Sequence, residues 1–214
     1  MKEMNIKDGR IQKEKSVPRE IVDWFFCIII AFVLAITIKY FIFTPSLVSQ
    51  TSMTPTILDK ERVLINRTVR TFGLPIYRGD IITFERPENT VDGVGTYSEP
   101  RNAKEFIIHD VLEIGKVSYI KRVIGIGGDH VYIENGKVYV NDKELEEVYL
   151  NGVETPRRGD FYDVDVPEGY IFVMGDNRSG SCDSREFGCI PLDKVEGRVV
   201  YRIWPLSAFG KIDK

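Results

Sequence analysis

A serine and a lysine are the residues whose types and surroundings could do chemistry. Ser52 follows shortly after a long apolar segment, and Lys121 lies in the apolar stretch 119–124. A serine hydroxyl is a poor nucleophile until a base removes its proton. The two histidines, His109 and His130, are interpreted as surface residues, which leaves a lysine kept neutral by burial as the base. If Ser52 and Lys121 meet, they form the reactive pair of a hydrolase.

The composition is that of a folded protein of moderate size. The 214 residues carry a net charge of −3, and no basic stripe stands out, so binding of nucleic acid is not expected. Without its N-terminal part the chain leaves roughly 170 residues, enough for one well-packed domain. We expect a monomer.

The cysteines leave a choice open. Cys182 and Cys189 are either free thiols or a disulfide, and Cys27 lies in the apolar segment. No cysteine and histidine spacing indicates zinc, and we expect neither a metal nor an organic cofactor.

Residues 21–43 are interpreted as a transmembrane anchor. The uncharged run 24–38 is 15 residues long, short for a span of about 20. If the amine of Lys39 reaches toward the membrane surface, residues 40–43 can also lie in the membrane and the span becomes long enough. A cleaved signal peptide is less favoured because residues 44–47 are a poor cleavage site. A buried helix of a soluble protein is less favoured because the segment has no polar face.

Basic residues predict the orientation of this anchor. Six lie in residues 1–20, but only Lys60 and Arg62 lie in residues 44–63. This excess of basic residues before the segment predicts that the tail, 1–20, lies in the cytoplasm and that the domain, 44–214, lies outside the cell membrane. Ser52 lies nine residues after Phe43, which keeps it within about 30 Å of the bilayer. That distance suits a substrate that is itself in the membrane lipid.

The outer domain is predicted to be mainly β. Expected strands cover residues 63–66, 80–84, 117–126, 130–134, 137–141, 169–174 and 199–203. Asn135-Gly136 between two alternating runs is typical of a tight hairpin. Two polar stretches are interpreted as variable loops. They are 88–116, with a short helical turn at 103–108, and the excursion 142–165. The pattern favours a folded-over antiparallel sheet, or barrel-like β domain, after one N-terminal transmembrane helix.

Four sequence blocks occur in order along the chain. They are Ser52-Met53-Thr54-Pro55-Thr56, Arg78-Gly79-Asp80-Ile81-Ile82-Thr83-Phe84, Tyr119-Ile120-Lys121-Arg122-Val123-Ile124-Gly125-Ile126-Gly127-Gly128-Asp129 and Met174-Gly175-Asp176-Asn177-Arg178-Ser179-Gly180-Ser181-Cys182-Asp183-Ser184-Arg185-Glu186-Phe187-Gly188. With the N-terminal anchor, these blocks resemble those of the bacterial type I signal peptidases, over residues 21–205.

The resemblance implies a role for each matching position. Ser52 matches the nucleophile, Lys121 the general base, and Ser181 a second serine that hydrogen-bonds the lysine amine. Asp183 and Arg185 match a structural charged pair behind the site. The implied activity is serine endopeptidase cleavage of secretory preproteins that carry small residues at the third and first positions before the cut.

Gln50 departs from the pattern of these peptidases. Serine or glycine is usual two residues before the nucleophile, where it helps to bind the oxyanion. The Ser52 backbone N–H is one oxyanion donor. The second is either the Gln50 amide or absent.

Three other functions compete with this interpretation. A protease with the same pair could cleave itself or one regulatory partner, although residues 1–20 are too short for a DNA-binding head. A non-catalytic anchored binding domain is the second alternative. A sortase-like transpeptidase is the third, but neither Cys182 nor Cys189 lies at the end of a predicted strand.

Overall fold

The computed structural model describes residues 6–7, 10–11, 17–97, 102, 104 and 117–212. These residues form two units, Met1–Lys39 and Tyr40–Lys214, which are considered separately. The expected helical turn at 103–108 lies, apart from Lys104, outside the described residues.

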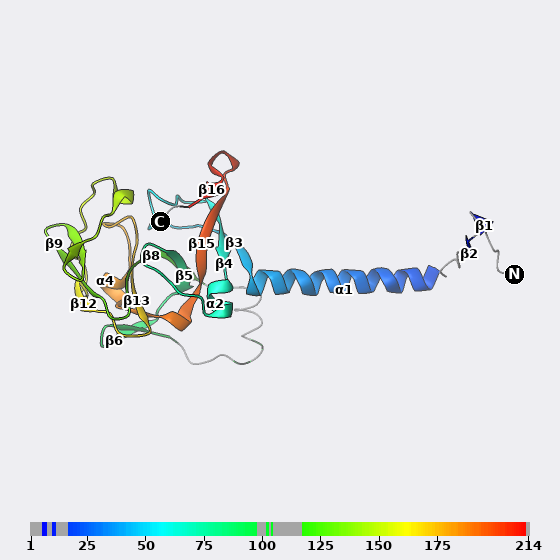
Figure 1. The fold of residues 1–214 in the computed structure, drawn as a ribbon, viewed down its shortest axis with the longest axis horizontal. Coiled ribbons are helices and arrows are strands. Elements are labelled where there is room, and N and C mark those ends of the chain that lie inside the picture. The colour runs from blue at the N-terminus through cyan, green and yellow to red at the C-terminus, as the bar shows by residue number, and fades with distance from the viewer. Residues whose placement is uncertain are drawn as a thin grey trace. The chain divides into compact units, whose positions relative to one another are not determined.

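The first unit is dominated by a single helix. Two short strands, β1 (Ile6–Lys7) and β2 (Arg10–Ile11), pair with each other and precede α1 (Val17–Phe41), which is drawn in Figure 1. Within α1, Glu20–Phe41 is long and apolar enough to cross a membrane, with a mean hydropathy of 2.7.

The helix boundaries differ from the predicted 21–43. The helix starts at Val17, and Pro18 fits its first turn because a backbone N–H is not needed there. It ends at Phe41 because Ile42 accepts a hydrogen bond from the Arg67 backbone N–H at 2.8 Å. The next residue, Phe43, already pairs with Asn66 in a sheet.

The second unit is built on a curled antiparallel sheet (Figure 1). Its strand order is β14-β13-β8-β5-β15-β4-β3, with β16 on β15. The strands are β3 (Phe43–Leu47), β4 (Arg62–Asn66), β5 (Ile81–Glu85), β8 (Ser118–Ile126), β13 (Tyr170–Met174), β14 (Ile190–Pro191), β15 (Val195–Trp204) and β16 (Gly210–Lys211). The predicted mainly β, antiparallel fold class is confirmed.

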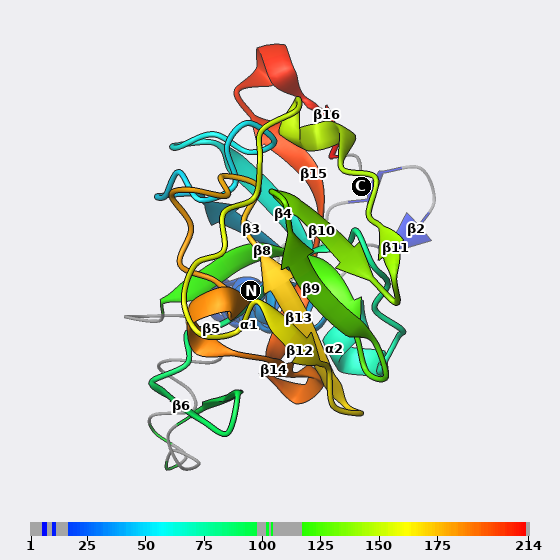
Figure 2. The same ribbon diagram turned by 90° about the vertical axis from the view of Figure 1, so that its left-hand side faces the viewer.

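A smaller sheet packs on the first. Its order is β11-β10-β9-β12, formed by β9 (His130–Glu134), β10 (Lys137–Val140), β11 (Lys143–Glu144) and β12 (Asp163–Asp165). Figure 2 shows it in front of β13 and β8. Buried side chains from both sheets, including Val131, Val138 and Phe172, form the core between them. The Asn135-Gly136 hairpin is confirmed, because both residues have positive φ, at 48° and 76°.

Both predicted loops contain more structure than expected. Within 88–116, β6 (Asn89–Val91) and β7 (Val94–Thr96) form a hairpin. Its turn residues, Asp92 and Gly93, have φ values of 49° and 78°, the chemistry of a tight turn. Within 142–165 lie β11, the 3₁₀ helix η2 (Val148–Leu150) and β12. The excursion is therefore an integral part of the smaller sheet.

Short helices complete the unit. They are α2 (Thr68–Phe72), α4 (Ser184–Phe187), η3 (Leu192–Lys194) and η4 (Leu206–Ala208).

Candidate active site

Ser52 lies in a tight turn between β3 and β4. The turn is closed by a hydrogen bond from the Ile57 backbone N–H to the Met53 carbonyl, at 2.9 Å. Met53 and Ile57 are buried in an apolar cluster beneath the turn, together with Val48 and Val63. These neighbours anchor the backbone, while the Ser52 side chain stays at the rim, with the residue 8% exposed.

Lys121 comes from the middle of β8. Its partner on β5 is Ile82, and the lysine is 1% exposed. The Nζ atom lies 2.8 Å from Ser52 Oγ and 3.1 Å from the Ile120 carbonyl oxygen. The structure therefore brings together the two residues that the sequence singled out, 69 positions apart.

Burial lowers the pKa of Lys121 to about 8. The charges of Asp183, Cys182 and Asp176 act in the opposite direction and raise the pKa. Both carboxylates are paired with arginines, Asp183 with Arg185 at 2.8 Å and Asp176 with Arg122 at 2.8 Å. Desolvation therefore outweighs their attraction for the ammonium form.

The 175–185 loop, which follows β13, contacts the serine turn directly. The Asn177 backbone N–H donates to the Ser52 carbonyl at 3.0 Å. Asp176 accepts a 2.5 Å hydrogen bond from Thr56 Oγ1. Gly175 lies so close that a Cβ there would sit 2.4 Å from the Ser52 carbonyl oxygen and 2.2 Å from Ser181 Oγ. The backbone around Ser52 is thus held from both sides.

Ser181 departs from the expectation. Its Oγ is buried and has no hydrogen-bond partner in the part of the chain that the structure describes. The expected hydrogen bond to the Lys121 amine is therefore absent, and Lys121 contacts the Ile120 carbonyl oxygen instead. The hydroxyl packs against Gly175, which leaves no room for a side chain at that position.

The other supporting residues have clear positions. Asp183 and Arg185 form the expected pair, with both side chains fully buried. Asp183 also accepts from the Gly175 backbone N–H at 3.0 Å and caps α4, so its role is to fix the 175–185 loop. Gln50 is exposed and lines the surface beside Ser52.

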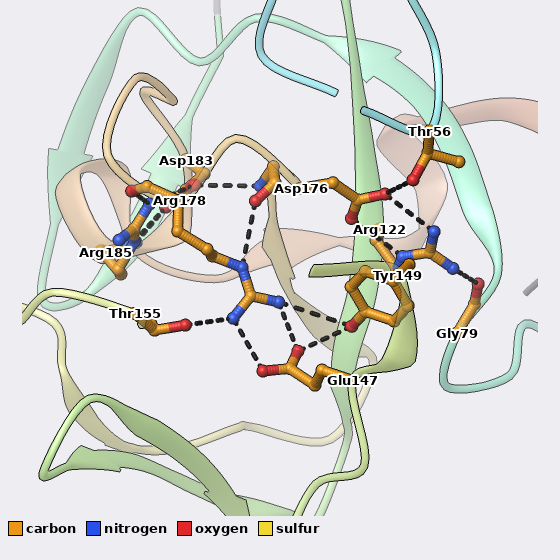
Figure 3. Close-up of polar contacts among 11 residues, drawn as sticks. Thr56, Gly79, Arg122, Glu147, Tyr149, Thr155, Asp176, Arg178, Asp183 and Arg185 are labelled. Carbon is orange, nitrogen blue, oxygen red and sulfur yellow. Dashed lines mark hydrogen bonds and ion pairs between the residues drawn. The ribbon is translucent and has the colours of Figure 1, made fainter. Parts of the chain in front are cut away.

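Sequence reasoning missed a buried polar network behind the loop (Figure 3). Glu147, Tyr149 and Thr155 come from the excursion and contact Arg178 or Arg122. They lie in a polar, acidic stretch that carries no motif, and only the fold brings them to the loop.

A cavity of about 310 Å³ opens beside Ser52. The lining nearest the turn includes Val48, Met53 and Ile120, and further lining comes from Ser46, Thr83, Ser118 and Glu196. Among the residues that the structure describes, the edge of β8 next to the cavity has no strand partner along Ser118–Lys121. Ser118–Lys121 pairs with β5 on one side, whereas on the other side β13 reaches only to Arg122.

The cysteines are free, with Cys189 buried and Cys182 exposed. Among the described residues no group of three or more His, Cys, Asp or Glu side chains could hold a metal ion.

The fold and these contacts define a β-rich enzyme with a serine and a lysine in contact. The sequence profile of the family described as "Signal peptidase, peptidase S26" matches residues 21–204, and the chain belongs to this family. The family and the enzyme class expected from the sequence, a serine endopeptidase, are confirmed.

Curated relatives agree with this assignment. Signal peptidase I of Bacillus licheniformis is 35% identical over 210 residues, which cover 94% of this chain and 98% of the relative. Signal peptidase IB of Staphylococcus aureus (strain COL) is 33% identical over 207 residues, covering 89% and 93%. A crystal structure of a signal peptidase I from Enterococcus faecalis V583 is 29% identical, with a TM-score of 0.40, and covers 58% of this chain and 97% of its own.

Proposed function

We propose that the chain is a membrane-anchored endopeptidase that removes N-terminal signal peptides from secreted preproteins, with Ser52 as nucleophile and Lys121 as general base. The single observation that carries this proposal is the 2.8 Å contact between Ser52 Oγ and a lysine amine that is 1% exposed. A buried amine with a pKa of about 8 is neutral in about one tenth of molecules at pH 7.

The chemistry follows from this contact. The neutral Lys121 Nζ takes the hydroxyl proton as Ser52 Oγ attacks the carbonyl carbon of the scissile bond. The Ser52 backbone N–H stabilises the oxyanion, and the exposed Gln50 amide is the available second donor. Collapse breaks the C–N bond, and the Lys121 ammonium returns the proton to the leaving amine of the mature protein. An acyl-enzyme on Ser52 remains.

Water completes the cycle. Lys121 takes a proton from the attacking water, which adds to the acyl carbon. The bond between the acyl carbon and Ser52 Oγ then breaks, and Oγ regains the proton from the Lys121 ammonium. The signal peptide leaves with a new carboxylic acid, which releases its proton to water, and the enzyme returns to its starting state.

The substrate would bind as an added strand. The open edge at Ser118–Lys121 and the residues after β3 lie on either side of the cavity, so an extended peptide can pair with the backbone there. Alternate side chains of a strand point to the same face, so the first and third residues before the cut enter the cavity together. The lining near Ser52 is apolar, which favours uncharged side chains at these positions.

The apolar helix would tether the enzyme at its substrate. We propose that α1 spans the membrane, with residues 1–20 in the cytoplasm and the domain outside. The support is the hydropathy of Glu20–Phe41 and the excess of basic residues before it.

A cleavage assay tests the proposal. Full-length protein in detergent is expected to cut a preprotein after an Ala-x-Ala site, and Ser52→Ala and Lys121→Ala are each expected to abolish cutting. Lys137→Ala, an exposed lysine on β10, serves as the control. Cutting by either of the first two variants at the wild-type rate would refute the assigned roles.

A further inference from the structure

The segment 147–161 of the excursion contacts all three arginines around the 175–185 loop. Glu147 and Thr155 bind Arg178, Tyr149 lies against Arg122, and the Pro156 carbonyl accepts from Arg185 at 3.2 Å. The segment makes no hydrogen bond to Ser52 or Lys121 among those that the structure describes. The segment contacts the 175–185 loop through Arg178 and Arg122, and also through its own Arg158, which donates to the Ser179 carbonyl at 2.7 Å.

Arg178 connects the segment to the main chain at the serine. Its Nη1 donates to Glu147 Oε2 at 2.8 Å and to Thr155 Oγ1 at 2.5 Å, and its Nη2 contacts Glu147 Oε1 (Figure 3). The Nε atom donates to the Gly175 carbonyl at 3.1 Å. The guanidinium is fully buried and the carboxylate is 8% exposed, so each charge depends on the other.

Arg122 connects the same segment to the other side of the site. Its guanidinium carbon lies 3.7 Å from the centroid of the Tyr149 ring. The Tyr149 hydroxyl donates to Glu147 Oε1 at 2.6 Å, so the ring and the carboxylate hold each other. Arg122 makes two hydrogen bonds to Asp176, and Asp176 accepts from Thr56 in the serine turn.

Both connections end on the 175–185 loop beside the serine turn. Arg178 donates to the Gly175 carbonyl, and Arg122 binds Asp176, which accepts the hydrogen bond from Thr56. Without the Glu147 carboxylate, the buried guanidinium of Arg178 loses its ion-pair partner, and its hydrogen bond to the Gly175 carbonyl is no longer fixed in place.

We propose that Glu147 and Tyr149 are positioning residues, which hold Arg178 on the Gly175 carbonyl and Arg122 on Asp176 and thereby fix the Ser52 backbone against Lys121. The proposal rests on the proposed function. Displacing reacting groups by about 1 Å can cost about 100-fold in rate. The signature of the positioning role is a loss in kcat with an unchanged KM, because the substrate cavity contains neither residue.

The first test removes one charge. Glu147→Gln keeps the size of the side chain, and Glu146→Gln makes the same change at an exposed neighbour. With the full chain and an Ala-x-Ala preprotein, we expect kcat to fall by about 10-fold or more in Glu147→Gln, with KM within about twofold. Glu146→Gln should match the wild type. An unchanged kcat in Glu147→Gln would overturn the proposal.

The second test uses the ring under Arg122. Tyr149→Leu removes the aromatic face, whereas Tyr149→Phe keeps it and loses only the hydroxyl. We expect kcat to fall by about threefold to 10-fold in Tyr149→Leu and most of it to be restored in Tyr149→Phe. Equal kcat values in the two variants would contradict the role of the ring.

A double variant separates positioning from stability. Glu147→Leu with Arg178→Met replaces the buried ion pair by apolar groups, which often restores thermal stability. The positioning role predicts that kcat stays low while the melting temperature recovers, because the bond from Arg178 Nε to Gly175 is gone. If kcat recovers together with the melting temperature, the network is only structural and the proposal fails.

The experiments distinguish failure of the proposed function from failure of the positioning role. If the wild type cuts no preprotein, the proposed function fails. If the wild type cuts, and both Glu147→Gln and Tyr149→Leu also cut at full rate, only the positioning role is refuted.

Discussion

Lys121 is enclosed by the protein, with Tyr119 and Ile120 beside it and Ser52 as its contact across the site. Two carboxylates, Asp176 and Asp183, are close enough to raise its pKa, yet each is bound to an arginine. An ammonium without water or a direct carboxylate partner is unfavourable. The amine is therefore the group here that can accept a proton near neutral pH.

Replacing this lysine with arginine tests whether the base must lose its proton. A guanidinium keeps its charge at any accessible pH, so Lys121→Arg cannot act as a base. We expect kcat/KM for preprotein cleavage to fall by at least about 100-fold, within the range that general base catalysis contributes. Lys137→Arg on the exposed face of β10 is the matched control. Wild-type activity in Lys121→Arg would show that the positive charge, and not the neutral amine, matters.

Gly175 gives a prediction about close packing at the same site. Gly175→Ala would place a methyl group 2.4 Å from the Ser52 carbonyl oxygen and 2.2 Å from Ser181 Oγ, so the backbone must move. We expect kcat to fall by about 100-fold for a displacement near 1 Å. Gly210→Ala, where a Cβ meets nothing within 4 Å, should be neutral. Steady-state cleavage kinetics check both, and an active Gly175→Ala would mean that the turn tolerates movement.

At the scale of elements, the sequence predicted the strands and turns that depend only on neighbouring residues. The alternation in β9 and β10 and the Asn135-Gly136 turn specify strands and a hairpin without help from the rest of the chain. The Asp92-Gly93 turn carries the same signal, which the polar surroundings of 88–116 concealed. Signals of this kind lie within a few residues and can be found in a single sequence.

The features that the sequence did not predict depend on contacts between residues far apart in the chain. Ser52 and Lys121 could be paired because their sequence blocks resemble those of a known family. Nothing near Glu147 indicates that it faces Arg178, 31 positions later. For Ser181 the error is the reverse. Its position in a motif predicts a hydrogen bond to Lys121, but among the described residues its Oγ has no hydrogen-bond partner.

The lining of the cavity gives a prediction for β8. Ile120 lies beside Lys121 and forms part of the apolar wall near Ser52. Ile120→Ala should enlarge the cavity, so that a preprotein with leucine in place of alanine before the cut is accepted. We expect the ratio of kcat/KM for the leucine and alanine substrates to rise by about 10-fold, the value of one to two methylene groups. An unchanged ratio would mean that this wall does not contact the substrate.

At the scale of the whole molecule, the chain joins an apolar helix to a separate β unit. The helical part needs no polar face if it spans a membrane, and Glu20–Phe41 meets that condition. Because Ser52 follows Phe41 by 11 residues, the extended chain limits it to about 40 Å from the helix end. The proposed arrangement therefore keeps the nucleophile near substrates that leave the membrane.

Thiol labelling tests the proposed orientation. Lys137→Cys lies on an exposed hairpin of the β unit, and Lys7→Cys lies in the N-terminal tail. With a membrane-impermeant reagent on intact cells, we expect additional labelling above the native cysteines only for Lys137→Cys. Detergent should expose both positions. Labelling of Lys7→Cys alone in intact cells would reverse the topology.

The pH dependence of preprotein cleavage tests most directly whether Lys121 is the base. Only the neutral amine can accept the Ser52 proton, so kcat/KM should rise about 10-fold per pH unit below the lysine pKa and level off above it. Burial lowers the pKa of Lys121 to about 8, so the midpoint of the pH profile is expected at about pH 8. A wild-type profile with this midpoint, together with no cleavage by Lys121→Ala at any pH, is the predicted result. A rate that stays constant from about pH 6 to about pH 10 would contradict a lysine base.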